Sequence, residues 1–249
     1  MKYLLTALLS LVYSNAPAFD LENHKYNDFE GTIDNKHQIY ISLYPSEDGT
    51  IKGHYFYKND EKKINLIGKY RQDKISLEEL DQNGVTFSAT FEGKLSTDDR
   101  DRFRGLKTTI TTRNSLDFNL SLAAVGSADW GRRYSAMGAE SDEEVEIFAG
   151  KIKQAIILSN YEWLSNQISY PINLSIKGKQ KKIKNKAAFL KFAPIAFTSL
   201  FKNKLFKYRT IDMFSNSTGV MIGTGEIWMS YVGNKVNGLF TLKVIGINN

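Results

Sequence analysis

The chain of 249 residues contains no cysteine, only 4 prolines and only 3 histidines. The absence of cysteine excludes disulfides, thiol nucleophiles, cysteine zinc sites and a lipid-anchored N-terminal cysteine. With so few prolines, and 18 glycines that follow no period, the sequence is neither collagen-like nor a proline-rich linker. Hydrophobic residues make up 42% and charged residues 24%, a balance typical of a globular protein rather than a disordered one.

Long hydrophobic runs are also lacking, and the one short run lies at the start of the chain. Lys2 precedes an apolar segment from Tyr3 to Tyr13, and Ala16-Pro17-Ala18 follows as a small-x-small sequence. This order is typical of a secretory signal peptide, whereas a membrane span needs about 20 apolar residues. The sequence therefore predicts a signal peptide over residues 1–18 and an exported protein, periplasmic or secreted. The alternative is a buried N-terminal helix.

Acidic residues become scarce toward the C-terminus. Residues 19–162 carry 19 basic and 25 acidic side chains, whereas residues 163–249 carry 13 basic and only 2 acidic ones, Asp212 and Glu226. The densest basic stretch consists of Lys177, Lys179, Lys181, Lys182, Lys184 and Lys186. Such a split can steer an anionic partner to the basic part or dock that part on the acidic half. The alternative is a solvated lysine face with no partner.

Residues 28–122 show the two-residue period of half-buried strands. Ile39, Ile41 and Leu43 alternate with polar or aromatic residues, and similar runs follow up to residue 122. Turn sequences such as Asn83-Gly84 separate the runs at about 8–12 residues, the spacing of an all-β sheet or barrel. We expect an antiparallel β domain over residues 19–123, with about eight strands in meander order as an open sheet or small barrel.

The pattern changes after an interdomain joint predicted at residues 124–142, which is rich in alanine, glycine and serine. Val145, Phe148 and Ile152 then recur at helical spacing, and Ser141 begins a capping box. Further helices are predicted at 161–168, 186–192 and 194–208. Strands are predicted at 172–176, around 183, at 211–213, 219–222 and 225–232, and at 236–247.

This order of elements resembles the nuclear-transport-factor-2-like superfamily over residues 143–249. The resemblance includes the break Ser169-Tyr170-Pro171-Ile172, the stretches Met213–Asn216 and Gly219–Trp228, and the final Val244–Asn248. It implies a cone-shaped α+β domain with a curved antiparallel sheet and an apolar cavity. The N-terminal half loosely resembles small exported bacterial β-meander domains, through Gly53–Tyr57 and Leu66–Gly68. The predicted fold class is therefore α+β, with two domains.

The sequence offers little for catalysis. His24, His37 and His54 all precede the C-terminal part, lie far from any nucleophile motif and lack carboxylates at ligand spacing, so we interpret them as surface residues. The glycines from Gly219 to Gly225 follow no phosphate-loop pattern and favour a tight hairpin. We predict no catalytic residue, metal or cofactor.

The predicted cavity supplies the remaining candidate site. Aromatic side chains and one carboxylate are its candidate lining: Trp163, Tyr170, Phe192, Phe197, Phe214, Glu226 and Trp228. If Glu226 and Trp228 faced the cavity, burial would raise the pKa of Glu226 and make it a candidate general base. In the favoured alternative, Ile227, Met229 and Tyr231 fill the core and Glu226 pairs with a lysine outside.

These patterns favour an exported, non-catalytic binding or interaction module, of the inhibitor or immunity type for example. Its basic C-terminal half would face an anionic protein, envelope polymer or lipid surface. The alternative is a small-molecule carrier or enzyme that binds an apolar ligand in the cone cavity. Nucleic acid is disfavoured, because the protein is predicted to be exported and the lysine run lacks interleaved aromatic residues.

Overall fold

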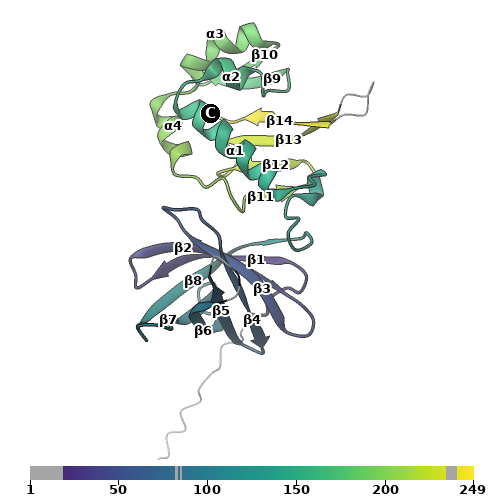
Figure 1. Cartoon of the computed structure of the whole chain (residues 1–249). Helices are drawn as coiled ribbons and strands as arrows, with labels where there is room; N and C mark the ends of the chain where they lie inside the picture. Colours follow the sequence, from purple (N-terminus) through teal and green to yellow (C-terminus); the bar gives the residue numbers. More distant parts are fainter. Residues whose placement is uncertain (1–18, 82–83, 85, 234–239) are drawn as a thin grey trace, which may run out of the picture.

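The structure, a computed structural model, describes residues 19–81, 84, 86–233 and 240–249. The predicted signal peptide, residues 1–18, lies outside the described residues. The N-terminal strands are β1 (Tyr26–Ile33), β2 (His37–Pro45), β3 (Thr50–Tyr57), β4 (Ile64–Arg71), β5 (Lys74–Leu80), β6 (Phe87–Thr97), β7 (Asp101–Thr109) and β8 (Ser115–Gly126). Each strand pairs antiparallel with the next, and β8 pairs with β1, so that the sheet closes into a barrel (Figure 1).

Alternating side chains fill the interior of this barrel. On β5, Ile75 and Leu77 are buried, whereas Lys74 before them and Ser76 between them are exposed. Phe91, Phe103 and other interior aromatic residues belong to the same buried cluster. Tight coiling of the sheet brings Gly93 on β6 opposite Gly105 on β7. A Cβ atom at Gly105 would lie 1.9 Å from the carbonyl oxygen of Glu92, so this position requires glycine.

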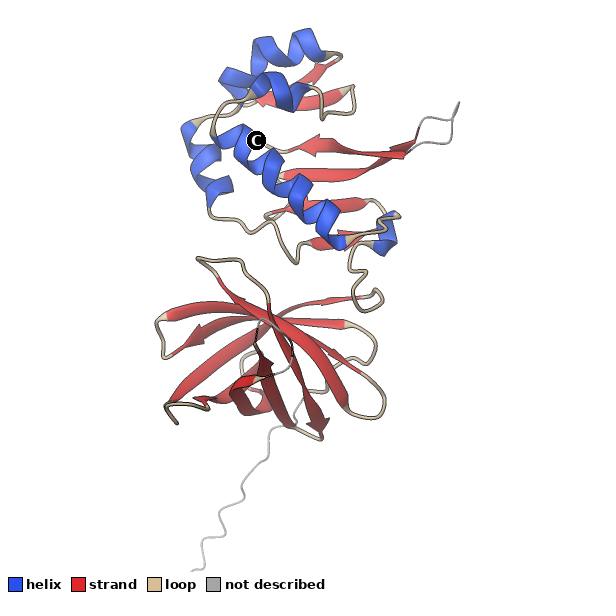
Figure 2. Cartoon of the chain, viewed as in Figure 1, coloured by secondary structure: helices blue, strands red, loops and turns tan. Residues whose placement is uncertain are grey.

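The rest of the chain, residues 127–249, is called the lobe below. Its elements are η1 (Ser135–Met137), α1 (Asp142–Ile157), α2 (Tyr161–Ser165), β9 (Ile172–Ile176), β10 (Lys179–Ile183), α3 (Lys186–Ala196), α4 (Ser199–Phe206), β11 (Phe214–Asn216), β12 (Gly219–Ile222), β13 (Ile227–Gly233) and β14 (Phe240–Ile247). Strands β11 to β14 form one sheet in chain order, and β9 and β10 form a hairpin (Figure 2). The Ser141 side chain caps α1 by accepting a hydrogen bond from the Glu144 backbone N–H, at 3.2 Å.

The predicted fold class, α+β with a cone-shaped C-terminal domain, is wrong. Strands dominate the described chain, as a closed barrel, a four-stranded sheet and a hairpin, while the helices span only 16, 5, 11 and 8 residues. Val220, Met229 and Val244 on the sheet are 0% exposed and share one buried cluster with Ile152 of α1. Side chains therefore occupy the space that a cone cavity would need. No described helix has both the length and the apolar character needed to cross a membrane.

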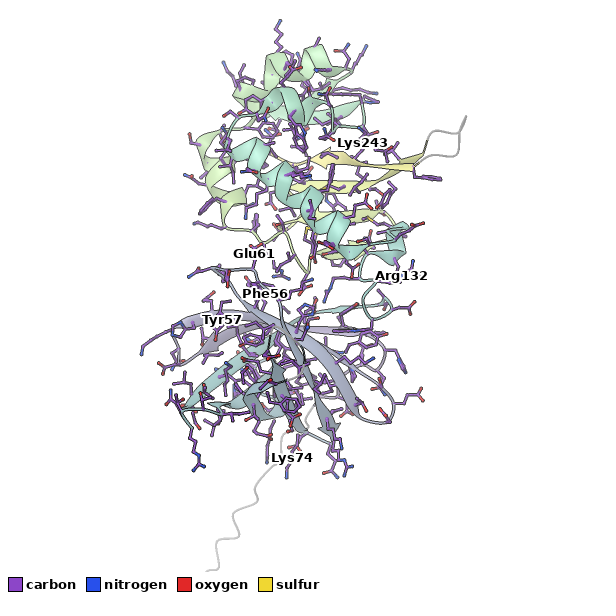
Figure 3. All side chains as sticks on the ribbon, in the orientation of Figure 1. Phe56, Tyr57, Glu61, Lys74, Arg132 and Lys243 are labelled. Carbon is purple, nitrogen blue, oxygen red and sulfur yellow. The ribbon has the colours of Figure 1, made fainter. Side chains whose placement is uncertain are left out.

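The barrel and the lobe meet along the side wall of the barrel rather than at its open end. Residues 26–29, 41–45 and 53–56 of β1, β2 and β3 are continuously buried, whereas β5 alternates between buried and exposed. The outward side chains within these stretches are therefore covered by the lobe, whereas Glu30, Gln38 and Lys52 farther along the same strands are exposed. Figure 3 shows Phe56 and Glu61 on the side of the barrel that faces the lobe, and Lys74 away from it.

Candidate functional sites at the junction and the basic end

A row of polar side chains crosses the covered wall of the barrel. Asp28 on β1 lies opposite Ser42 on β2, and Ser42 lies opposite His54 on β3. All three point outward, because their neighbours Phe29, Ile41 and Tyr55 belong to the barrel interior. They are 9%, 2% and 7% exposed, so the lobe must supply partners for them.

Arg133, from the segment between β8 and α1, provides the first partner. Its Nη1 and Nη2 donate to the two carboxylate oxygens of Asp28 at 2.7 and 2.9 Å, and Nη2 also donates to Ser42 Oγ at 2.5 Å. The guanidinium lies 4.1 Å from the ring centroid of Tyr26, in cation–π geometry. Arg133 is 7% exposed, so this bidentate pair is shielded from water.

Asp212, just before β11, is the second partner that the lobe supplies. Its Oδ2 lies 2.5 Å from His54 Nε2, and its Oδ1 lies 2.9 Å from Lys63 Nζ and 3.5 Å from Arg133 Nε. Lys63 also pairs with Glu146 of α1 at 2.9 Å. Together these six charged or titratable residues and Ser42 form the junction cluster: Asp28, Ser42, His54, Lys63, Arg133, Glu146 and Asp212. The cluster joins barrel and lobe through ion pairs that are largely buried.

The surroundings shift the pKa values of Asp212 and Lys63 in the junction cluster. Burial alone would raise the pKa of Asp212, but the charges of His54 and Arg133 outweigh it and hold the pKa well below its ordinary value of 3.8. The pKa of Lys63 is raised, because the carboxylates of Asp212 and Glu146 outweigh the effect of burial. Because Asp28, Glu146 and Asp212 each contact Arg133, Lys63 or both, the cluster suits a structural joint better than a proton-transfer site.

The interpretation of His54 as a surface residue is therefore wrong, and sequence reasoning missed Arg133 altogether. One signal was present, since the outward positions of β2 and β3 include Tyr40, Tyr44 and Phe56, which are unusual on a solvated wall. Phe56 is 0% exposed. His37 remains exposed, near the ring of Tyr57.

A cleft of about 350 Å³ opens beside the junction cluster and is called the junction cleft below. Its lining comes from both parts: Tyr26, Asp28, Ala124, Val125, Gly126, Ser127, Arg133, Ala136, Arg209, Asp212, Met213, Phe214, Ser215 and Asn216. A neighbouring hollow of about 260 Å³ shares Arg209, Met213 and Phe214 with it. The Arg209 guanidinium lies between the two and stacks 4.3 Å from the ring centroid of Tyr40.

Trp163, Tyr170, Phe192 and Phe197 all pack in or against the lobe core, but no hollow described here gathers the predicted pocket residues around one cavity. Phe214 lines the junction cleft, whereas Trp163 borders a separate hollow on α1 with Lys151 and Leu158. Phe197 is buried in the lobe core and stacks on Tyr161, with ring centroids 5.6 Å apart. Tyr170 meets Phe189 edge-on, and Phe192 lies under Lys181. The alternative function that used a cone cavity therefore loses its proposed site.

Glu226 and Trp228 also lie apart from any such cavity. Ile227 and Met229 are 0% exposed and fill the core, while Glu226 pairs with Lys204 at 2.5 Å. Although burial opposes it, the Lys204 hydrogen bond lowers the pKa of Glu226. A lowered pKa is the reverse of what a general base at neutral pH requires. Trp228 lies opposite Gly246 on β14 and is half-buried.

The lysine run forms the hairpin β9–β10 and the start of α3. Lys186 is half-buried and pairs with Glu162. The other five are exposed, and the described residues offer none of them an ion pair: Lys177, Lys179, Lys181, Lys182 and Lys184. We call these five side chains the basic end. Elements β10 and α3 lie at the end of the molecule farthest from the barrel, so the lysines do not dock on the acidic half (Figure 1).

Comparisons with known proteins add little to this geometry. No family model matches the chain, and no curated protein matches it. Among solved structures, the tryptamine complex of the amine binding protein of Rhodnius prolixus aligns with 60% of this chain and 80% of its own, at 10% identity and a TM-score of 0.28. Likeness at this level establishes neither a shared fold nor a shared ligand. The resemblance of residues 143–249 to the nuclear-transport-factor-2-like superfamily is tested by none of these comparisons and stays a prediction.

Proposed function

We propose that this protein is an exported, non-catalytic binding protein whose basic end engages an anionic partner. The observation that carries the proposal is the unneutralised charge of the β9–β10 hairpin. The only acids after residue 162 are Asp212 and Glu226, and both are bound elsewhere, by the junction cluster and by Lys204. The positive potential of the hairpin therefore reaches solvent and can attract an anionic surface.

The position of the hairpin supports this function. Strand β10 has four exposed residues in a row, Lys179 to Lys182, and only Ile183 is buried. A strand with so little buried surface contributes little to the core, so its lysines are free to contact a partner. Lys181 lies 4.4 Å from the ring centroid of Phe192 on α3, which holds the hairpin against a helix.

Charge removal at the basic end tests the proposal. The variant Lys179→Gln, Lys181→Gln, Lys182→Gln should lose affinity for polyglutamate and for vesicles containing anionic lipid by about tenfold or more. Its salt dependence should also flatten, because fewer charges remain to be screened. The melting temperature should hardly change, since exposed lysines contribute little to stability.

A matched control is available on the barrel. The variant Lys52→Gln, Lys69→Gln, Lys74→Gln removes the same charge from exposed strand positions and should bind as the unaltered protein does. Equal losses in both variants would show that net charge alone attracts the anion and would contradict a dedicated site. Binding of polyglutamate but not of vesicles would favour a protein or polymer partner over a lipid surface.

Export is part of this proposal and has its own test. The residues before Phe19 have the order of a cleaved signal peptide, so the mature protein should begin at Phe19. N-terminal sequencing of protein recovered outside the cytoplasm checks the cleavage. Protein that keeps Met1 in a soluble cytoplasmic pool would contradict it.

A further inference from the structure

Near the lobe, one edge of strand β8 pairs with no strand in the part of the chain that the structure describes. The pairing of β7 with β8 ends at Arg102 and Ser121, whereas the pairing of β1 with β8 continues to Tyr26 and Gly126. Residues 122–126 are therefore paired on one side only, where the chain leaves the barrel for the lobe (Figure 1). Alternate backbone N–H and C=O groups of this segment point away from β1 and can bond another strand.

This edge carries neither of the two side-chain protections against pairing, a charge or a proline, and is interrupted by a bulge at Ala123. Its sequence is Leu-Ala-Ala-Val-Gly, with neither a charge nor a proline, and residues 123–125 are exposed. Proteins ordinarily cover such an edge or place lysine, proline or a bulge on it. The single register shift in the β1–β8 pairing leaves Ala123 as a bulge between Leu122 and Ala124, so the regular free edge consists of residues 124–126.

A second unpaired edge faces the same space. Strand β11 is the outer strand of the lobe sheet and, among the described strands, pairs only with β12. Its residues Phe214, Ser215 and Asn216 line the junction cleft together with residues 124–126 of β8. The hydroxyl of Ser215 is buried and has no hydrogen-bond partner among the described residues. Both walls of the cleft thus present hydrogen-bonding groups to whatever enters.

We propose that the junction cleft binds an extended peptide segment of a partner protein, which adds as a strand to the free edge of β8 or β11. The cleft volume of about 350 Å³ accommodates a short stretch of single chain and is too small for the edge of a second barrel. Strand addition takes its affinity from backbone hydrogen bonds and its specificity from alternate side chains.

The lining indicates which side chains the peptide carries. Val125, Met213 and Phe214 form an apolar wall, and Phe214 is 48% exposed. Arg209 donates from Nε and Nη2 to the carbonyls of Ile211 and Asp212, and its Nη1 has no partner among the described residues. An apolar residue followed two positions later by a carboxylate would satisfy both features.

The acids that line the cleft do not oppose such a peptide. Asp28 and Asp212 are both engaged by Arg133, and Asp212 also by His54 and Lys63, so their charge is already balanced. Among the described residues that line the cleft, the cation without an acidic partner is therefore Arg209.

The test selects peptides from a random 12-residue display library on the full chain and maps their contacts by hydrogen exchange. Enriched peptides should slow exchange of backbone amides within 122–126 or 214–216. The variant Ala124→Lys, which places a charge on the edge, should weaken the affinity for these peptides by about tenfold or more. Ala187→Lys adds the same charge to an exposed position on α3 and should leave binding unchanged. Arg209→Gln should weaken the binding only of those peptides that carry a carboxylate.

Several results would overturn the proposal. One is a library that yields no binder, and another is a set of binders that leaves both segments unprotected. Concentration-dependent protection of residues 122–126 without peptide would assign the edge to a second copy of the chain instead. Because the hydrogen-exchange measurement uses the unaltered protein, it tests peptide binding at these two edges even if Ala124→Lys fails to fold.

Discussion

Asp212 is the residue on which the junction depends most. It is 4% exposed, adopts a positive φ of 45°, and contacts cations from the barrel and from the joining segment. Its backbone N–H donates to Glu146 Oε1 at 3.0 Å, and that oxygen also accepts from the hydroxyl of Tyr134 at 3.0 Å. Loss of one carboxylate would therefore leave several buried donors and charges without a partner.

Substitution of this carboxylate should destabilise the protein strongly. Asp212→Asn keeps the size but leaves His54, Lys63 and Arg133 facing a neutral amide, and removal of one partner of a buried pair costs about 3–5 kcal/mol. Chemical denaturation measures the free energy of unfolding. Asp60→Asn, in the exposed turn after β3, should change it by less than about 0.5 kcal/mol. An equal effect of both substitutions would refute the importance of the junction cluster.

Acid should lower the free energy of unfolding through the carboxylate of Asp212. The pKa of Asp212 is lower in the folded protein than its ordinary value of 3.8, so the unfolded chain binds the proton more readily. The stability contributed by this shift is present above about pH 4 and is lost as the pH falls through the lowered folded value. Unfolding free energies measured between pH 7 and pH 2 should therefore fall less steeply for Asp212→Asn. A profile as steep as that of the unaltered protein would assign the acid loss to other carboxylates.

Among the elements, the strands of the barrel follow their sequence pattern where one wall is solvated. The alternation of Ile75 and Leu77 with polar residues on β5 is visible in the sequence and in the burial. The same pattern says nothing of the lobe, because a sequence period reports which residues face inward and not what covers the outer wall. Tyr40 and Phe56 therefore indicate from the sequence that something covers this wall, but not which part of the chain covers it.

Two glycines differ in what a side chain would meet: Gly105 lies where two strands approach closely, and Gly150 lies in helix α1. Gly105→Ala would place its Cβ 1.9 Å from the Glu92 oxygen and should cost about 1–3 kcal/mol or more. Gly150→Ala in α1 would meet only Thr210 Oγ1 at 3.7 Å and should stabilise the helix by up to about 1 kcal/mol. Thermal unfolding of the two variants should show melting temperatures that shift in opposite directions. Shifts in the same direction would contradict this account of the barrel.

At the scale of the whole molecule, the lobe core begins before the predicted domain boundary at residue 143. Tyr134 is 0% exposed, Met137 and Ala139 belong to the same cluster, and the Tyr134 hydroxyl accepts from the Met213 N–H at 3.0 Å. We expect a fragment of residues 127–249 to be markedly more stable than residues 143–249, because the shorter one exposes that core. Circular dichroism during heating compares them. Equal melting temperatures would show that the joining segment is dispensable.

The two candidate sites differ in how far the sequence reveals them. The basic end consists of residues within ten positions of one another, so composition alone locates it. The junction cluster draws Asp28, Arg133 and Asp212 from positions about a hundred or eighty residues apart, and each alone resembles an ordinary surface charge. Only the closure of the barrel and the packing of the lobe against its wall bring them within bonding distance.

The order in which these charges occur along the chain also has a consequence for biosynthesis. As the chain emerges, Asp28 and Ser42 come first, Arg133 arrives after the last barrel strand, and Asp212 comes only within the final forty residues. A barrel that folds during synthesis would thus expose Lys63 and Arg133 without their last counter-charge until the chain is almost complete. A chain that terminates early would keep these cations uncovered, and proteases or chaperones that recognise unfinished proteins could distinguish it from the finished one.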